Sequence, residues 1–134
     1  MGGGRYLRVM LDTNAFDRLD ADPEAASELA ERRDLRLLVS EIQIAQLEAI
    51  PDEARRGRYL ALADSLCARV SAASVRATPA RADRHEPDRM IAAAADARCD
   101  LLVTDDEGLL SYARGAGVRA MDWKHFAGSI LFRR

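Results

Sequence analysis

The sequence has few of the residues that hold small proteins together through cross-links or bound metals. Its 134 residues include two cysteines and two histidines. Cys67 and Cys99 form no CxxC pair, and neither His85 nor His125 has a cysteine at zinc-finger spacing. We therefore expect no structural zinc site and no disulfide framework, and interpret both thiols as reduced and half-buried. A chain of this length can bury a core without such links.

Long hydrophobic segments are also missing. No apolar run approaches the roughly 20 residues that a membrane-spanning helix requires. The N-terminal segment, MGGGRYLRVML, has too short an apolar part for a secretory signal. We expect a single domain over residues 1–134, located in the cytoplasm without membrane contact, with residues 1–4 forming a flexible leader.

Lysine is almost absent: 19 of the 20 basic residues are arginines, and the exception is Lys124. The net charge of −2 shows that the chain as a whole is not a polycation. Several arginines cluster, as in residues 32–36, 55–58, 81–89 and 133–134. We interpret most of these clusters as solvated helix faces, while local patches for a nucleic-acid backbone remain an alternative.

Short apolar runs alternate with segments of helical pattern. We expect strands at residues 6–11, 35–39, 101–104 and 118–121, and a further short strand at 75–78. Helices are expected at residues 14–19, 22–33, 41–50, 51–69, 87–98 and 109–114. Such alternation predicts an α/β fold with a parallel central sheet and helices on both faces. Ligands of such sheets bind beyond the carboxyl ends of the strands.

Aspartates occupy these strand ends. Asp12 follows the first strand, Asp105 and Asp106 follow the run LLVT, and Asp88 lies in the first turn of an alanine-rich helix. Taken singly, Asp12, Asp88 and Asp106 fit helix caps, and Asp105 fits an exposed position. Taken together at one edge, they would repel one another unless a cation lay among them. Oxygen ligands suit Mg²⁺ or Mn²⁺, which can position water and stabilise charge on a phosphoryl group.

Three segments around these acids resemble the motifs of PIN-domain nucleases, a family that includes the toxins of VapBC-type toxin–antitoxin pairs. The segments are MLDTNAF (10–16), DRMIAAAA (88–95) and LLVTDDEGL (101–109), which occur in the expected order and span nearly the whole chain. The resemblance implies a Rossmann-like PIN domain and a Mg²⁺- or Mn²⁺-dependent ribonuclease. It also implies RNA as substrate, and a cognate antitoxin and a second copy of the chain as candidate partners.

The resemblance assigns roles residue by residue. Asp12, Asp88 and Asp106 correspond to the first, third and fourth metal-binding catalytic acids, with Asp105 as an accessory metal-binding acid. Asn14 and Thr104 would hold the site by hydrogen bonds.

The second acid of the family marks a departure. The family has a glutamate on the helix after the second strand, and the best match in SEIQIAQLEAI (40–50) is Gln46. Gln46 could lend its amide oxygen to a metal or a water, but it supplies no charge. Glu48 is two residues further, about 200° around a helix, and we interpret it as part of a solvated stripe with Glu41.

Gln46 therefore separates two hypotheses: a metal-dependent endoribonuclease of toxin type, or a degenerate PIN domain that binds RNA or a protein without cleaving. A phosphoacceptor receiver domain ranks low, because it would need an acid pair after the first strand and a lysine near the site. A dinucleotide-binding domain is disfavoured, since no GxGxxG follows Leu11.

Overall fold

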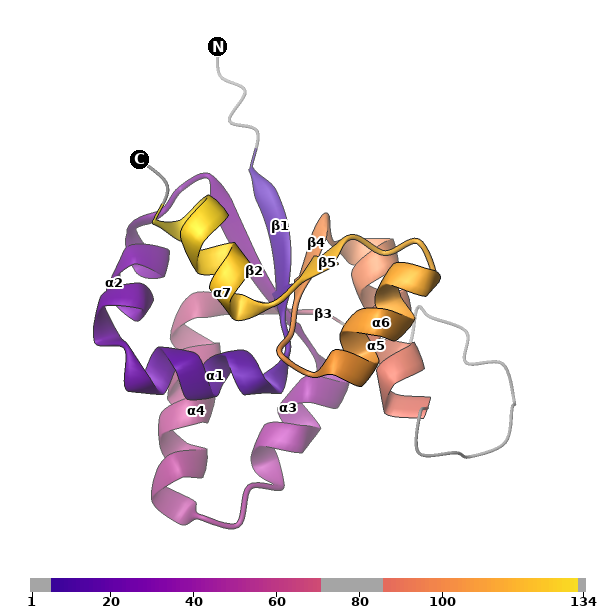
Figure 1. The fold of residues 1–134 in the computed structure, drawn as a ribbon. Coiled ribbons are helices and arrows are strands. Elements are labelled where there is room, and N and C mark those ends of the chain that lie inside the picture. Colours follow the sequence, from indigo (N-terminus) through magenta and orange to yellow (C-terminus); the bar gives the residue numbers. More distant parts are fainter. Residues whose placement is uncertain (1–5, 71–85, 133–134) are drawn as a thin grey trace.

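The computed structural model describes residues 6–70 and 86–132. Five parallel strands form one sheet: β1 (Leu7–Leu11), β2 (Leu35–Ser40), β3 (Cys67–Val70), β4 (Leu101–Val103) and β5 (Ala120–Met121). Their order across the sheet is β3-β2-β1-β4-β5, so β1 lies at the centre (Figure 1). The predicted α/β fold with a parallel central sheet is confirmed, and the carboxyl ends of all five strands meet at one edge.

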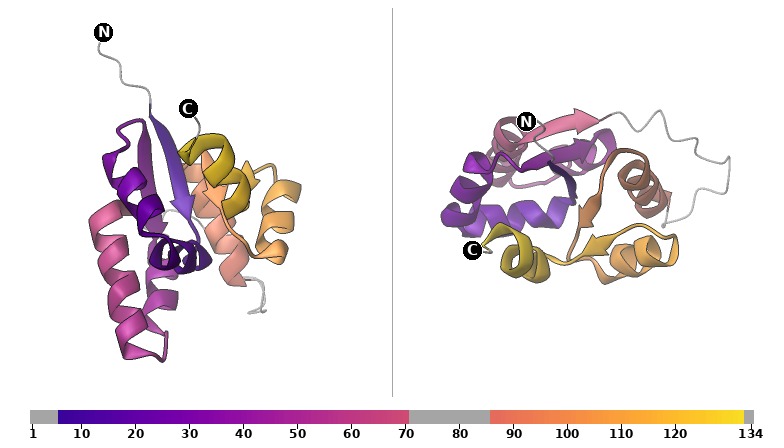
Figure 2. Two further views of the ribbon diagram at one scale, coloured as in Figure 1. Left: turned by 60° about the vertical axis from the view of Figure 1, so that its left-hand side comes forward. Right: turned by 90° about the horizontal axis from the view of Figure 1, so that it is seen from above.

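Helices cover both faces of the sheet, as predicted (Figure 2). One face is covered by α1 (Thr13–Ala21), α2 (Pro23–Glu31), α4 (Glu53–Leu66), α7 (Trp123–Phe126) and the π-helical turn Ala127–Leu131. The other face is covered by α5 (Glu86–Arg98) and α6 (Glu107–Gly115). The side chains of a strand alternate between the faces, so Val9 and Leu11 enter the first core and Met10 enters the second.

The helix α3 (Glu41–Glu48) follows β2 directly and lies at the carboxyl edge of the sheet (Figure 1). Its buried Ile44 and Leu47 belong to the first core, and its partly buried Ile42 packs against the second. Ser40 and Gln43 form a capping box that fixes where the helix begins. The helix therefore presents a face to the strand ends at a defined position.

Several predicted boundaries shift in the structure; the last strand, for example, covers Ala120–Met121 and not 118–121. The helical pattern suggested a helix up to about Arg69, but α4 ends at Leu66 and residues 67–70 form β3, which pairs with β2. Pairing with a neighbouring strand overrides local propensity there. The strand predicted at residues 75–78 lies outside the described residues. The first helix is longer than predicted, and α6 begins two residues early at Glu107 because Asp106 caps it.

The sequence analysis missed the short helices after Asp122, because α7 spans four residues and carries no long apolar period. Gly117, with φ of +83°, provides the left-handed residue after α6. Within residues 6–70 and 86–132, no helix has both the length and the hydrophobicity to span a bilayer.

Candidate active site

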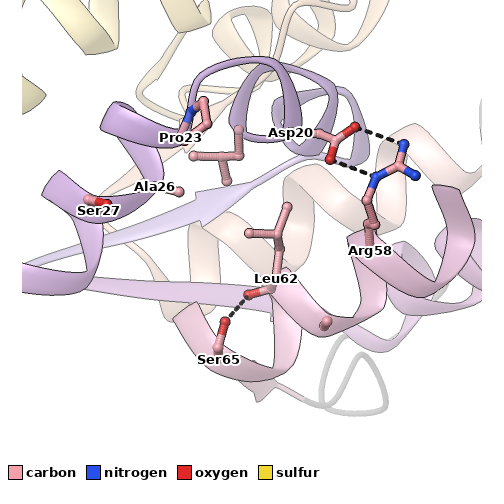
Figure 3. Close-up of a pocket in the computed structure, with 9 residues that line it drawn as sticks. Asp20, Pro23, Ala26, Ser27, Arg58, Leu62 and Ser65 are labelled. Atoms are coloured by element: carbon pink, nitrogen blue, oxygen red, sulfur yellow. Dashed lines mark hydrogen bonds and ion pairs between the residues drawn. The ribbon is translucent and has the colours of Figure 1, made fainter. Parts of the chain in front are cut away.

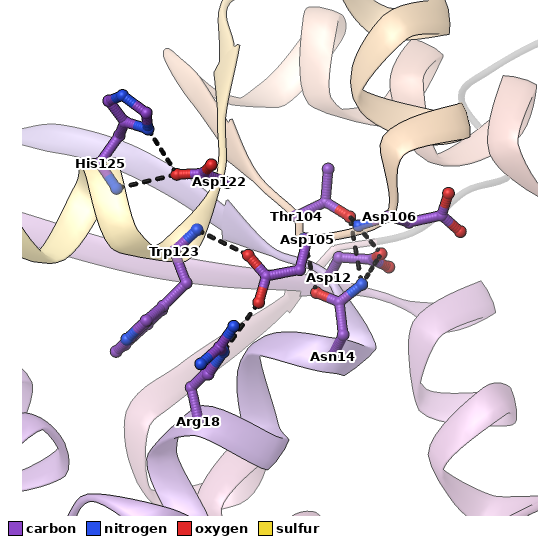
Figure 4. Close-up of polar contacts among 9 residues, drawn as sticks. All are labelled: Asp12, Asn14, Arg18, Thr104, Asp105, Asp106, Asp122, Trp123 and His125. Carbon is purple, nitrogen blue, oxygen red and sulfur yellow. Dashed lines mark hydrogen bonds and ion pairs between the residues drawn. The ribbon is translucent and has the colours of Figure 1, made fainter.

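The carboxyl ends of β1 and β4 bring the predicted acids from two distant segments together (Figure 4). Leu11 is in register with Val103, and the backbone N–H of Asp12 donates to the carbonyl of Val103 at 2.9 Å. Asp12 therefore leaves the sheet directly beside Thr104, Asp105 and Asp106. Parallel pairing of adjacent strands is the reason that residues more than 90 positions apart share one edge.

Asp12 is the most deeply buried of these acids, with 5% of its surface exposed. Its Oδ2 accepts hydrogen bonds from Thr104 Oγ1 at 2.7 Å and from Asn14 Nδ2 at 3.3 Å. Burial raises the pKa of Asp12, and the nearby charge of Asp106 raises it further. Hydrogen bonds, chiefly that from Thr104, oppose this rise in pKa. Asp12 is thus a desolvated carboxylate held by neutral donors.

Thr104 links the acids to one another. Its fully buried hydroxyl donates to Asp12 and accepts the backbone N–H of Asp106 at 3.0 Å. Asn14 Nδ2 lies 3.3 Å from the same oxygen. The polar contacts of Asn14 and Thr104 therefore fix the Asp12 carboxylate relative to the backbone of Asp106.

Asp106 caps the N-terminus of α6. Its Oδ1 accepts the backbone N–H groups of Gly108 at 2.9 Å and Leu109 at 3.1 Å. The capping role considered from the sequence thus exists, together with proximity to Asp12. Gly108 suits this cap, because a Cβ there would lie only 3.2 Å from the same Oδ1. The capped oxygen fixes the carboxyl group, whose second oxygen accepts no hydrogen bond from the described residues.

Asp105 has a different environment from its neighbour. Its Oδ1 accepts the backbone N–H of Trp123 at 2.9 Å, and its Oδ2 accepts Arg18 Nε at 2.8 Å. Its own backbone N–H donates to Asn14 Oδ1 at 3.0 Å. The side chain is 23% exposed and points toward α1 and α7, away from Asp12 (Figure 4). The sequence interpretation of Asp105 as an exposed residue missed both Arg18 and Trp123.

Two glutamines of α3 contribute buried amides. Gln43 is fully buried, and its Oε1 accepts the Ser40 N–H at 2.7 Å. Its side chain lies close enough to Asp12 to lower the pKa of the carboxyl group, although its Nε2 forms no hydrogen bond with the described residues. Gln46 Oε1 is likewise buried without a partner. Residues three apart are neighbours on a helix surface, so we expect the two amides to lie on the same side of α3.

The sequence analysis identified Gln46 but missed Gln43. The signal for Gln43 was the spacing Ser40-x-x-Gln43, which marks a capping box. A buried amide atom without a partner costs about 1–3 kcal/mol, so the two unpartnered amide atoms of α3 call for a ligand or for water. The unpartnered oxygen of Gln46 is the kind of donor that Mg²⁺ and Mn²⁺ accept.

Asp88 lies in the first turn of α5, as predicted. Two residues separate α5 from β4, so the helix runs back along the strand and its first turn is directed toward the carboxyl edge (Figure 1). The placement of the Asp88 side chain is not described, and its part in the site stays a prediction. Among the side chains that are described, no three of His, Cys, Asp and Glu are grouped closely enough to hold a metal ion.

A groove lies away from these acids, between α1, α2 and α4 (Figure 3). This groove has a volume of about 490 Å³ and is lined largely by apolar side chains such as Leu19, Ala26 and Leu62. At its rim, Arg58 Nε donates to Asp20 Oδ1 at 2.9 Å and Nη2 to Oδ2 at 3.1 Å. The groove offers no cluster of acids, so the candidate active site is the edge that carries Asp12.

Comparison with known proteins identifies the fold. No protein-family model matches the chain, and no curated protein matches it. Solved structures do: the PIN domain endonuclease Utp24 matches at 21% identity with a TM-score of 0.61, covering 90% of this chain and 86% of that one. A PilT N-terminus domain protein from the hyperthermophilic archaeon Sulfolobus solfataricus P2 matches at 13% identity and a TM-score of 0.64, covering 96% and 97%.

A third similar structure is VapBC2 from Rickettsia felis bound to a DNA fragment from its promoter. The match has 16% identity and a TM-score of 0.58, and covers 87% of this chain and 99% of that one. The chain therefore has the PIN-domain fold over nearly its whole length, as the sequence motifs implied.

Proposed function

We propose that this protein is a divalent-metal-dependent endoribonuclease. The observation that carries the proposal is the buried Asp12 carboxylate at the end of β1, with Asp106 beside it at the end of the neighbouring β4. A desolvated acid with a raised pKa, placed beside a second acid at the ligand-binding edge of a parallel sheet, is typical of a functional site. The shared fold with a PIN domain endonuclease supports nuclease chemistry.

The donor set fits Mg²⁺ or Mn²⁺. Asp12 and Asp106 would hold the ion, with Asp88 from α5 and the buried amide oxygen of Gln46 as further oxygen ligands. When bound, such an ion lowers the pKa of water and stabilises charge on a phosphoryl group. Asp105 is left out of this set, because both of its oxygens already accept hydrogen bonds from Arg18 and Trp123.

The residues around the donors orient them. Thr104 and Asn14 fix the Asp12 carboxylate through two hydrogen bonds of 2.7 and 3.3 Å, and contact each other at 3.3 Å, so that the carboxylate meets a ligand in one orientation. The α6 cap does the same for Asp106. A rigid site of this kind loses little entropy when an ion or a phosphodiester binds.

We further infer a toxin role within a toxin–antitoxin pair. The support is the similarity to the Rickettsia felis VapBC2 structure, in which 99% of the matched chain is covered by this one. A cognate antitoxin and a homodimer are then the expected protein partners. Co-expression with the product of an adjacent small reading frame, followed by co-purification, tests this inference.

A second candidate is a PIN domain that binds RNA or a protein without cleaving. Gln46 favours it, because an amide stands where the family has a carboxylate and the site loses one negative charge. Mg²⁺ gives up its waters reluctantly, so the missing charge lowers its affinity.

The experiment is a cleavage assay on single-stranded RNA with Mn²⁺ or Mg²⁺, comparing the wild type with Asp12→Asn and with Asp64→Asn as control. Asp64 is a 64% exposed acid on α4 that pairs with Arg69, so its substitution removes the same charge outside the site. We expect the wild type and Asp64→Asn to cleave RNA slowly, and the cleavage rate of Asp12→Asn to be at least about 100-fold lower. No protein should cleave RNA in EDTA, which removes the metal. Equal activity of the three proteins, or none in any, would favour the non-catalytic candidate.

A further inference from the structure

Among the described residues, Arg18 is a cation that forms an ion pair at the acidic edge. Arg18 lies on α1, one turn after Asn14, and its Nε donates to Asp105 Oδ2 at 2.8 Å. Asn14 and Arg18 are four residues apart and therefore share a face of the helix, from which both contact Asp105 (Figure 4). Asp105 is adjacent in sequence to the candidate metal ligand Asp106.

Asp105 is itself held in place. The Trp123 N–H donates to its other oxygen, and its backbone N–H donates to Asn14. Contacts from α1 and from the start of α7 therefore hold Asp105, which is the described partner of the Arg18 guanidinium. An unpaired surface arginine would lose more side-chain entropy on binding a ligand than Arg18, which this ion pair already restricts.

Only one of the guanidinium nitrogens of Arg18 is used in this arrangement. Within the described residues, neither Nη1 nor Nη2 has a hydrogen-bond partner, and the side chain is 56% exposed. The donors left over form a planar pair that matches two oxygens of a phosphate group. An RNA that approaches Asp12, Asp105 and Asp106 meets three like charges, and Arg18 is the positive group fixed beside them.

Building on the proposed nuclease function, we propose that Arg18 is a substrate-positioning residue that binds a backbone phosphate of single-stranded RNA next to the scissile bond. Asp105 serves as its orienting partner and not as a metal ligand. The contact reads phosphate and carries no base specificity.

The test measures RNA binding without cleavage, so that it does not depend on catalytic activity. Fluorescence anisotropy with a labelled single-stranded RNA in EDTA gives the Kd over a range of salt concentrations for wild type, Arg18→Ala and Asp105→Asn. Both substitutions remove the ion pair between Arg18 and Asp105 and leave the contact of Asn14 with the Asp105 backbone in place, but only Arg18→Ala removes the cation.

The opposite edge of the sheet offers matched controls. There Arg8 forms an ion pair with Asp100 through two nitrogens, Nε 3.3 Å from Oδ2 and Nη2 3.2 Å from Oδ1, and the two side chains are 45% and 38% exposed. Arg8→Ala changes the net charge as Arg18→Ala does, and Asp100→Asn as Asp105→Asn does. A difference in Kd between the two variants of a matched pair therefore reflects where the substituted residue lies and not a change in net charge.

We expect Arg18→Ala to raise the Kd at least about 5-fold and to reduce the slope of log Kd against log salt by about 0.7, the value for one phosphate contact on a single strand. The Kd of Arg8→Ala, which changes the net charge by the same amount, should stay within about 2-fold of the wild-type Kd. Asp105→Asn should bind RNA as tightly as Asp100→Asn or more tightly. If Arg18→Ala and Asp105→Asn weaken RNA binding equally, the ion pair has only a structural role and the proposal is overturned. An unchanged Kd in Arg18→Ala, or no RNA binding by the wild type at low salt, would also overturn it.

These outcomes are separable from the fate of the nuclease function. If the wild type binds RNA through Arg18 but never cleaves it with Mn²⁺, the nuclease proposal fails and the phosphate contact stands. If the wild type cleaves RNA and Arg18→Ala cleaves it with unchanged KM, the phosphate contact fails and the nuclease function stands.

Discussion

Substitution of Asp12 by asparagine should stabilise the metal-free protein. Asp12 is a carboxylate with 5% exposure whose described partners are neutral donors, and burial raises its pKa. A buried ion without a counter-charge costs several kcal/mol, of which hydrogen bonds recover a part. Asparagine keeps an acceptor for the Thr104 hydroxyl, and exchanging a charged for a neutral acceptor loses about 1 kcal/mol. The net expectation is a gain of roughly 1–3 kcal/mol in the free energy of unfolding.

The gain should depend on pH. Because the pKa of Asp12 is raised in the folded state, the folded protein binds this proton more tightly than the unfolded chain does. The penalty from Asp12 is therefore fully present above the folded pKa, and it disappears as the pH falls toward the unfolded value of about 3.9. The difference between Asp12→Asn and the wild type should be largest at neutral pH and small near about pH 4.

Bound metal should make the wild type more stable than Asp12→Asn. A ligand at a concentration 100 times its Kd stabilises the folded state by about 2.7 kcal/mol, and only the wild type retains the Asp12 charge that attracts the metal. The assay is chemical denaturation at several pH values, with EDTA or with Mn²⁺. A loss of more than about 1 kcal/mol in Asp12→Asn without metal would refute this reasoning, because it would make Asp12 a structural acceptor whose hydrogen bonds outweigh its desolvation.

Three further predictions follow from single groups. Asp106→Ala should lower the free energy of unfolding by about 1 kcal/mol, because it removes the α6 cap. Asp106→Asn can still cap the helix and should be close to neutral without metal. In thermal melts, Mn²⁺ should stabilise both variants less than it stabilises the wild type. Gln46→Glu should tighten Mn²⁺ binding and raise RNA cleavage, while the exposed control Glu48→Gln should change neither; the reverse pattern would make Glu48 the second acid. Burial raises the pKa of both Cys67 and Cys99 to about 12. A thiol reagent at mildly alkaline pH should therefore react slowly with the native protein and fast with the protein in denaturant, and fast labelling of the native protein would contradict this prediction.

The fold was predictable because its signals are local and repeated. Residues 7–11, 35–40 and 101–103 form short apolar strands, and helices with recognisable starts lie between them, as at Asp22-Pro23. The edge strand β3 was missed, because residues 67–69 continue a helical pattern and only pairing with β2 makes them a strand. A strand whose residues are only partly buried carries too weak a periodicity to be identified from sequence.

The candidate site was predictable in its backbone positions but less so in its contacts. That Asp12 and Asp106 converge follows from parallel topology alone, because both come directly after a strand. The Asp105 contact to Arg18 spans 87 positions, and the contact to Trp123 uses a backbone N–H of a helix that was not predicted. No pattern in the neighbourhood of residue 105 reports either partner. Side-chain pairing across the molecule depends on packing, which periodicity does not encode.

Two adjacent aspartates at the end of a strand would repel each other if they faced the same way. Here the backbone turns them to separate positive groups: Arg18 neutralises Asp105, and the N-terminal dipole and N–H groups of α6 stabilise Asp106. Asp12 differs: it stands at the N-terminus of α1, but its side chain makes no cap hydrogen bond there, and burial raises its pKa. Of these three acids, Asp12 is the most deeply buried, and no ion pair of the described residues offsets its negative charge. A cation that binds at this edge therefore gains most from Asp12, which is why substitution of Asp12 separates a metal site from a set of helix caps.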